Sequence, residues 1–131
     1  MSRTNQPPAV LTADTRIPFP HTQTRLACRK DPGLFVHDYG QTTSPDDIAR
    51  IQQASAACRR CPIAEGCLKW ALANPKMTTS GIWAATTARQ RTALRRRLRE
   101  RLGDNWVDRV VQADQARTPR RQPQPLRGRA A

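Results

Sequence analysis

Four cysteines constrain the fold of this chain more than any other feature. Three of them fall in the segment CRRCPIAEGC, from Cys58 to Cys67, and the fourth, Cys28, lies far upstream. A C-x-x-C pair such as Cys58 and Cys61 lets two thiolates reach one centre from one turn of chain. Four thiolates suit a tetrahedral zinc ion and a four-iron, four-sulfur (4Fe-4S) cluster equally well. The spacing therefore predicts one metal centre and leaves zinc or iron–sulfur open.

Composition favours a metal centre over disulfide bonds. Of 131 residues, 37% are hydrophobic and 5% aromatic, so the core is small and is expected to need a covalent or metal staple. The chain shows neither a membrane-length apolar run nor the apolar core of a secretory signal, which predicts a cytoplasmic protein with no membrane partner. Structural disulfides are uncommon in that compartment. A thioredoxin-like dithiol would need a βαβ context that the sequence lacks, and four merely buried cysteines would not cluster in this way. We interpret His21 and His37 as ordinary polar residues.

The apolar pattern predicts an all-α fold, a small helical domain of about four short helices with flexible N- and C-terminal tails. Residues 1–24 are rich in Pro, Thr and Gln, and we interpret them as a flexible arm. The ordered domain is expected over 25–103, followed by a short amphipathic helix over 104–116. The Arg- and Pro-rich residues 117–131 are expected to be disordered.

Capping signals predict where the helices begin and end. Ser44 and Pro45 are expected to start a helix that ends near Cys58. A second helix is expected to begin at a Cys61 cap and to end at Asn74 and Pro75. The remaining signals are a capping box from Thr87 to Gln90, an apolar stripe at Leu94, Leu98 and Leu102, a stop at Gly103 and a cap at Asp104.

Positive charge is concentrated at the C-terminal end. The net charge is +13, and arginine supplies 20 of the 23 basic residues. Such a one-signed excess predicts a polyanionic partner, most simply DNA, although an ordinary run of charges is often only a solvated face. Arg127-Gly128-Arg129 has the core of an AT-hook but lacks the following proline, and it also arises by chance in an Arg-rich tail. The residues predicted to contact DNA phosphates are Arg95, Arg96, Arg97, Arg120, Arg121, Arg127 and Arg129.

Three segments resemble the WhiB-like family of bacterial proteins. They are LACRKDPGLFV, AACRRCPIAEGCLKWALAN and GIWAATTARQR, so the resemblance extends from about Ala27 to Leu102. It implies a small helical fold around a 4Fe-4S cluster whose ligands are Cys28, Cys58, Cys61 and Cys67. It also implies a transcriptional regulator, not an enzyme, that senses oxygen, nitric oxide or redox poise. The expected partners are the C-terminal region of the primary sigma factor of RNA polymerase and promoter DNA. Cluster-free members are associated with a disulfide bond and with protein disulfide reductase activity.

Two tryptophans receive roles from this resemblance. Trp70, three residues after Cys67, is expected to shield the cluster or simply to pack in the core. Gly81, Ile82 and Trp83 match the family turn that meets sigma factor, with Trp83 either an interface anchor or a buried turn residue. The family has two glycines next, where this chain has Ala84 and Ala85. Because glycine pairs permit positive φ, the alanines put the turn geometry and the grip on sigma factor in doubt.

Three functions therefore stand as hypotheses. The leading one is an iron–sulfur transcriptional regulator. The second is a zinc-stapled basic module that binds nucleic acid, and the third is a cluster-free disulfide reductase that uses Cys58 and Cys61. Arg59 and Arg60 lie between these two thiols. They are expected to lower the thiol pKa values in the reductase and to favour the reduced, more negative state of a bound cluster.

Overall fold

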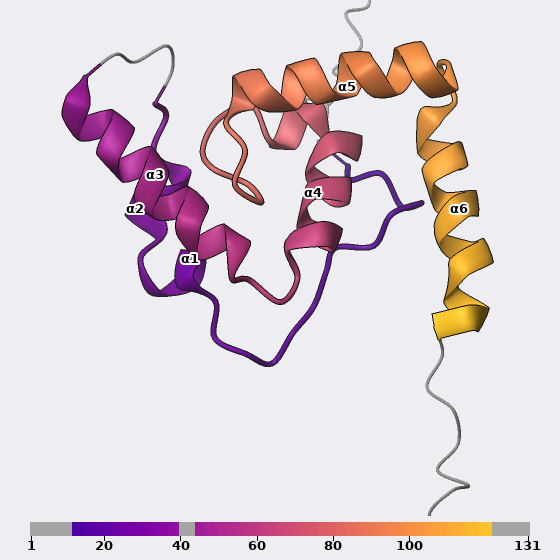
Figure 1. Ribbon diagram of the computed structural model, residues 1–131, viewed down its shortest axis with the longest axis horizontal. Coiled ribbons are helices and arrows are strands. Elements are labelled where there is room, and N and C mark those ends of the chain that lie inside the picture. The colour runs from indigo at the N-terminus through magenta and orange to yellow at the C-terminus, as the bar shows by residue number, and fades with distance from the viewer. Residues whose placement is uncertain (1–11, 40–43, 122–131) are drawn as a thin grey trace, which may run out of the picture.

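A computed structural model describes residues 12–39 and 44–121 of the chain. Within these ranges the secondary structure is helical and contains no strand, apart from one isolated bridge between Trp83 and Thr86. The predicted all-α class is confirmed. Figure 1 shows α3 with α1 and α2 beside it, α4 at the centre, and α5 running across one end of the molecule to meet α6. The elements are α1 (Ala27–Lys30), α2 (Pro32–Val36), α3 (Pro45–Arg59), α4 (Ala64–Ala73), the 3-10 helix η1 (Pro75–Met77), α5 (Ala88–Leu102) and α6 (Trp106–Arg121).

Most of the local helix signals act as the sequence predicts. Ser44 is the N-cap of α3 and Pro45 its first residue. Thr87 and Gln90 form the reciprocal capping box at the start of α5, and Gly103 ends that helix with a φ of 88°. Two predicted starts are wrong. Helix α4 begins at Ala64 with Ile63 as its N-cap, not at Cys61, and α6 begins at Trp106.

The N-terminal arm differs from the prediction of a flexible segment over 1–24. Its described part, from residue 12, lies against the helices, and Ile17 is buried in a core with Trp70 and Trp106. The Asp14 backbone N–H donates to Asn74 Oδ1 at 2.7 Å, and Arg16 pairs with Asp108 at 2.9 Å. One apolar residue in a polar segment carries little periodic signal, so only its tertiary partners explain why this segment docks.

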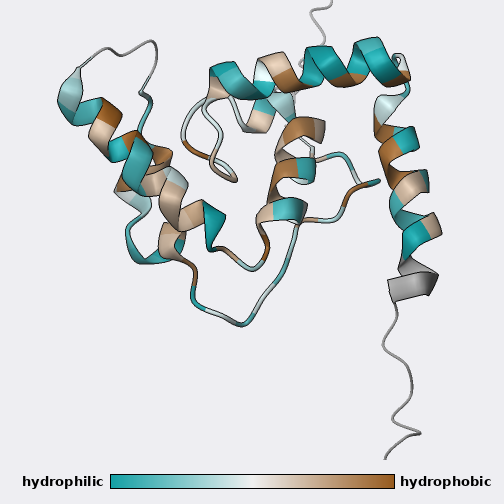
Figure 2. Cartoon of the chain, viewed as in Figure 1, coloured by the Kyte–Doolittle hydropathy of each residue, from teal (hydrophilic) through white to brown (hydrophobic). Residues whose placement is uncertain are grey.

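The hydrophobic core has two parts. One joins the arm, α4 and α6 through Ile17, Trp70, Leu72, Trp106 and Val107. The other joins α2, α3 and the segment before α5 through Leu34, Phe35, Tyr39, Ala54 and Ile82. The most extensive helix contacts likewise fall within α1–α3 or within α4–α6 and not between these two groups. In Figure 2 hydrophobic residues concentrate on α4, whereas α5 is mostly hydrophilic.

The segment 81–86 connects the two halves of the molecule. The Ile82 backbone N–H donates to the Phe35 carbonyl at 2.7 Å, and the Ile82 side chain enters the α2–α3 core. Gly81 has a φ of 77°, and a Cβ there would lie 2.5 Å from the Phe35 carbonyl oxygen. Glycine at this position is therefore required both by the backbone conformation and by the close approach to α2.

Helix α6 continues to Arg121, past the predicted boundary at residue 116. Arg120 and Arg121, assigned to a disordered tail, fall in its last turn. Lys69 of α4 pairs with Asp114 at 2.8 Å, which fastens the middle of α6 to the core helix. Over the described ranges, every helix is too short or too polar to cross a membrane.

Candidate metal centre

The four cysteines face one cavity of about 220 Å³ between the two halves of the molecule. Cys28 comes from α1 and is exposed, whereas Cys58 near the end of α3, Cys61 in the α3–α4 connection and Cys67 in α4 are partly buried. The walls are largely apolar and include Phe19, Leu26, Phe35, Ile63, Ile82 and Trp83. Tertiary structure thus brings Cys28 to the same cavity as the three clustered cysteines.

The spacing of the cysteines bears on which metal group fits. A single zinc ion holds its sulfur ligands at about 2.3 Å from one point. No group of three or more His, Cys, Asp or Glu side chains among the described residues is arranged to hold one metal ion. All four thiols nevertheless border the same cavity. The four thiols therefore share one cavity, and their donor set suits a thiolate-bound metal group.

Burial controls the ionisation of the two inner cysteines. Burial raises the pKa of Cys58, although the backbone N–H groups of Ala85 and Ala84 act in the opposite direction. Burial and the neighbouring cysteines raise the pKa of Cys67 to about 11, and the Ala84 N–H again opposes this. Without a metal, both thiols are therefore largely protonated at neutral pH, and a bound cation would displace their protons.

Ala84 and Ala85 adopt the backbone conformation that the sequence put in doubt. Their φ angles are 50° and 63°, a left-handed region that costs a non-glycine residue about 1–2 kcal/mol. Trp83 and Thr86 close the turn by mutual backbone hydrogen bonds at 3.0 Å and 2.9 Å. The turn therefore forms with alanine at both positions, and its backbone is strained there.

The aromatic residues beside the cavity form a row. Trp70 stacks on Trp83 with ring centroids 5.5 Å apart, and Phe19 packs edge-on against Trp70 at 4.9 Å. Phe19 and Trp83 border the cavity, whereas Trp70 lies behind them in the core. These contacts match the core-packing interpretation of Trp70, which affects the cavity only through its two neighbours. Trp83 is partly exposed, while Gly81 and Ile82 are buried.

Two arginines of α5 have structural partners that the sequence did not reveal. Arg95, predicted to contact DNA, donates from Nε to the Leu72 carbonyl at 2.8 Å and from Nη2 to the Ala71 carbonyl at 2.8 Å. It therefore caps the end of α4. Arg91 is fully buried and holds carbonyls of the 78–86 segment. Their positions in the sequence could have indicated this, because Arg91 and Arg95 fall on the same face of α5 as Leu94 and Leu98.

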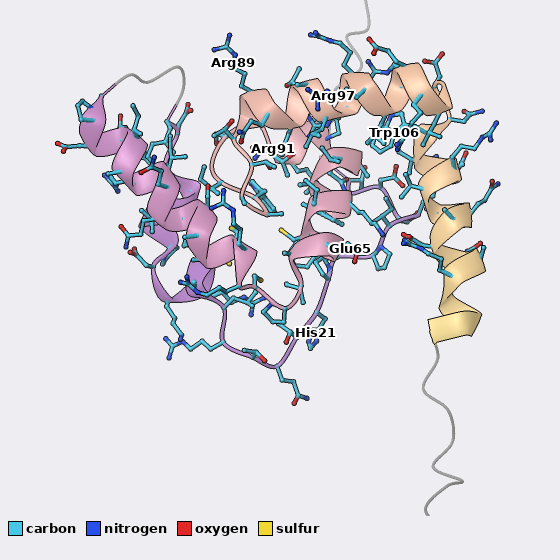
Figure 3. The ribbon with its side chains drawn as sticks, viewed as in Figure 1. His21, Glu65, Arg89, Arg91, Arg97 and Trp106 are labelled. Carbon is cyan, nitrogen blue, oxygen red and sulfur yellow. The ribbon has the colours of Figure 1, made fainter. Side chains whose placement is uncertain are left out.

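Other arginines remain available to solvent. Arg96 and Arg97 are exposed on α5, together with Arg89, Arg99 and Arg101. Figure 3 shows Arg89 pointing away from the body of the molecule and Arg91 on the inner side of the same helix. Arg127 and Arg129 lie outside the described residues.

Comparison with known proteins assigns this geometry to a family. Residues 23–94, which contain all four cysteines and the 81–86 segment, match the family model described as transcription factor WhiB. The chain belongs to the WhiB family. It is thus a member of a family of transcription factors.

Curated WhiB regulators cover the same region. The chain is 36% identical over 74 residues to the transcriptional regulator WhiB1 of Mycobacterium tuberculosis, which spans 56% of this chain and 82% of that protein. WhiB1 of Bifidobacterium longum is 38% identical over 74 residues, 56% of this chain and 75% of that protein. WhiB2 of the same organism is 32% identical over 76 residues, 58% of this chain and 67% of that protein. The arm before residue 23 and α6 lie outside the family match.

Proposed function

We propose that this WhiB protein binds a 4Fe-4S cluster through Cys28, Cys58, Cys61 and Cys67 and regulates transcription in response to oxygen, nitric oxide or redox poise. The observation that carries the proposal is the single cavity that all four cysteines line. When bound, the cluster would supply an electron-transfer centre sensitive to such oxidants. The protein's own part is to hold four thiolates from both halves of the fold and to surround them with apolar walls.

Metal content under strict anaerobiosis tests this proposal. We expect the purified protein to be brown and to contain iron and acid-labile sulfide in equal amounts. A colourless protein with one zinc per chain would instead establish the zinc-stapled module. The same four thiols would serve zinc, so metal content and not the ligand set separates the two groups.

The disulfide reductase alternative is weakly supported. Such an enzyme needs a thiolate nucleophile, and burial raises the pKa of Cys58 away from neutrality. Arg59 and Arg60 are exposed, so water and salt screen their influence on the thiols. Turnover of an insulin disulfide by the metal-free protein, lost on Cys61→Ser, would restore this alternative.

The partner proposed for the 81–86 segment is the C-terminal region of the primary sigma factor. Trp83 supports this because it is partly exposed at the cavity edge and is held by its stack on Trp70. Buried neighbours such as Gly81 and Ile82 set the position of Trp83 and offer little surface of their own. The turn also keeps positive φ at both alanines, which supports a family-like presentation of Trp83.

Replacing Trp83 by alanine is expected to weaken sigma-factor binding by at least about 2 kcal/mol, because a rigid aromatic anchor is typical of an interface hot spot. The measurement is a titration with the purified C-terminal region of the primary sigma factor. Trp83→Phe is the control, since it keeps an aromatic ring to stack on Trp70. Unchanged affinity of Trp83→Ala, at wild-type metal content, would remove this residue from the interface.

The surface proposed for DNA is the exposed face of α5, with Arg96 and Arg97, together with Arg120, Arg121, Arg127 and Arg129 towards the C-terminus. Arg95 is left out of this set because its guanidinium is already bonded to α4 carbonyls. Arginine-rich helices bind phosphates largely without regard to base sequence. The contribution of α5 is therefore affinity and position on the promoter, not base recognition.

The double variant Arg96→Gln/Arg97→Gln is expected to lower the slope of log binding constant against log salt concentration by about 2, one unit for each lost phosphate contact. Fluorescence anisotropy with a promoter duplex at several salt concentrations measures it. Arg25→Gln/Arg50→Gln is the matched control, because it removes the same charge from exposed sites outside α5. An equal fall of the slope in both variants would show that only net charge matters.

A further inference from the structure

Arg91 is a buried cation whose partners are backbone carbonyls. It has no exposed surface and donates to the carbonyls of Thr78 at 2.8 Å, Ser80 at 3.0 Å, Gly81 at 3.2 Å and Thr86 at 2.6 Å. In the described part of the chain it forms no salt bridge. A buried charge is costly, so such an arginine is retained only where its hydrogen bonds are worth that cost.

The carbonyls that Arg91 holds lie at both ends of the strained turn. Gly81 precedes Ala84 and Ala85, and Thr86 follows them. These two alanines are the non-glycine residues with positive φ in the described ranges. Strained backbone of this kind persists where its surroundings over-determine it. Arg91 supplies that constraint from a neighbouring helix.

The strained turn borders the cysteine cavity. Consecutive residues with unusual φ and ψ can form a concave nest of N–H groups, a feature of many anion and iron–sulfur sites. The N–H groups of Ala84 and Ala85 act on the Cys58 sulfur, and that of Ala84 acts also on Cys67. Ala84 itself borders the cysteine cavity. The turn therefore sets its left-handed backbone against the cavity that the four thiols border.

The positive charge of Arg91 also favours the thiolate form of Cys67. Burial, with some repulsion from Arg95, lowers the pKa of Arg91 to about 10, so it stays protonated at neutral pH. The same guanidinium attracts the Cys67 thiolate. Arg91 is buried whereas Arg59 and Arg60 are exposed, so water and salt screen the charge of Arg91 less.

We propose that Arg91 is a positioning residue of the metal centre, which fixes the carbonyls of Gly81 and Thr86 so that the Ala84 and Ala85 amides point at the sulfurs of Cys58 and Cys67. The inference rests on the proposed metal-binding function and adds a specific supporting residue to it. Groups that support metal ligands in this way typically change metal affinity by about 10–100-fold when they are lost.

The test compares metal release from three variants with that from the wild-type protein. Each is loaded anaerobically with ferrous iron and sulfide, and separately with Zn²⁺, and is then exposed to a chelator. We expect Arg91→Lys to release metal about tenfold faster, because lysine keeps the charge but loses the planar fork. Adding Ala84→Gly and Ala85→Gly is expected to restore most of the loss, since glycine adopts positive φ without support. Arg95→Lys, which affects carbonyls of α4 instead, is the matched control and is expected to release metal at the wild-type rate.

The glycine rescue separates positioning from plain packing. If Arg91 were only a satisfied core residue, the glycine pair would not slow metal release, and that result would overturn the proposal. So would a wild-type release rate in Arg91→Lys. If Arg91→Lys alone does not fold, the glycine-containing variant is expected to fold, and its failure would count equally against the proposal.

Amide hydrogen exchange keeps this inference distinct from the function on which it rests. If the wild-type protein holds neither iron–sulfur nor zinc, the proposed function fails, and the metal-free protein still tests the role of Arg91. We expect Arg91→Lys to speed exchange at the Ala84 and Ala85 amides by about tenfold relative to Arg95→Lys. Equal exchange in the two variants would overturn the positioning role.

Discussion

Cys67→Ser is expected to abolish stable metal binding and to loosen the join between the two halves of the protein. Serine keeps the size and removes the thiolate, and loss of a ligand should reduce metal affinity by at least about 100-fold, since loss of a supporting residue already costs about 10–100-fold. The most extensive helix contacts do not cross between α1–α3 and α4–α6, whereas the cysteines come from both groups. Metal binding is therefore expected to contribute to folding as well.

Two measurements check this expectation. Iron and sulfide per chain, determined anaerobically, should fall to background in Cys67→Ser. The unfolding temperature of the wild-type protein should fall on chelation to near that of the variant. Ala64→Ser is the matched control, because Ala64 borders the same cavity and the change adds a hydroxyl without removing a ligand. Wild-type iron content in Cys67→Ser would contradict the four-cysteine ligand set.

Trp106→Ala is expected to lower the free energy of unfolding by about 3–5 kcal/mol, the usual cost of removing a buried tryptophan. Trp106 lies in the core cluster with Ile17, Trp70 and Leu72, so its loss leaves a cavity where the arm, α4 and α6 meet. The Arg16–Asp108 and Lys69–Asp114 pairs are partly exposed and are each worth at most about 1 kcal/mol. These pairs cannot compensate for the lost burial, so α6 should detach first.

Denaturant unfolding of the metal-loaded protein, with hydrogen exchange along α6, measures the effect. Trp106→Phe is the control and should retain most of the stability because it keeps a large apolar ring. Metal content should stay at the wild-type level while the variant is folded, since none of the α6 residues whose side chains the structure describes borders the cysteine cavity. A change below about 1 kcal/mol would show that α6 is not anchored by this tryptophan.

The sequence predicted the long helices well where their signals are local. The capping box of Thr87 and Gln90 and the stop at Gly103 depend on neighbouring residues, and both appear as expected. The predicted start of α4 was wrong because proline is as acceptable in the turn before a helix as in its first turn, and Pro62 lies in that turn. Cys61 lies in the α3–α4 connection and borders the cavity. Short elements such as α1 and α2 carry too few residues for a periodic pattern.

The sequence predicted which residues form the metal site, but not the geometry of the backbone around it. Cysteine spacing indicated one centre, and the family resemblance supplied the four-ligand assignment. Neither could show that Ala84 and Ala85 adopt positive φ, because alanine disfavours that conformation and its local preference argues against the turn. Arg91 donates to the carbonyls of Gly81 and Thr86 on either side of the turn, and a sequence pattern does not encode these hydrogen bonds.

The sequence by itself determined the helical class, the main capping signals, the four thiols and the excess of arginine, because these depend on composition and on residues near one another in the chain. Only the tertiary structure decided which arginines are available to a partner. Arg91 and Arg95 belong to the same basic run as Arg96 and Arg97, yet their position on the apolar stripe turns them inward to backbone carbonyls. The tertiary structure likewise decided that the arm packs against the helices, since the core residues that contact Ile17 come from both α4 and α6.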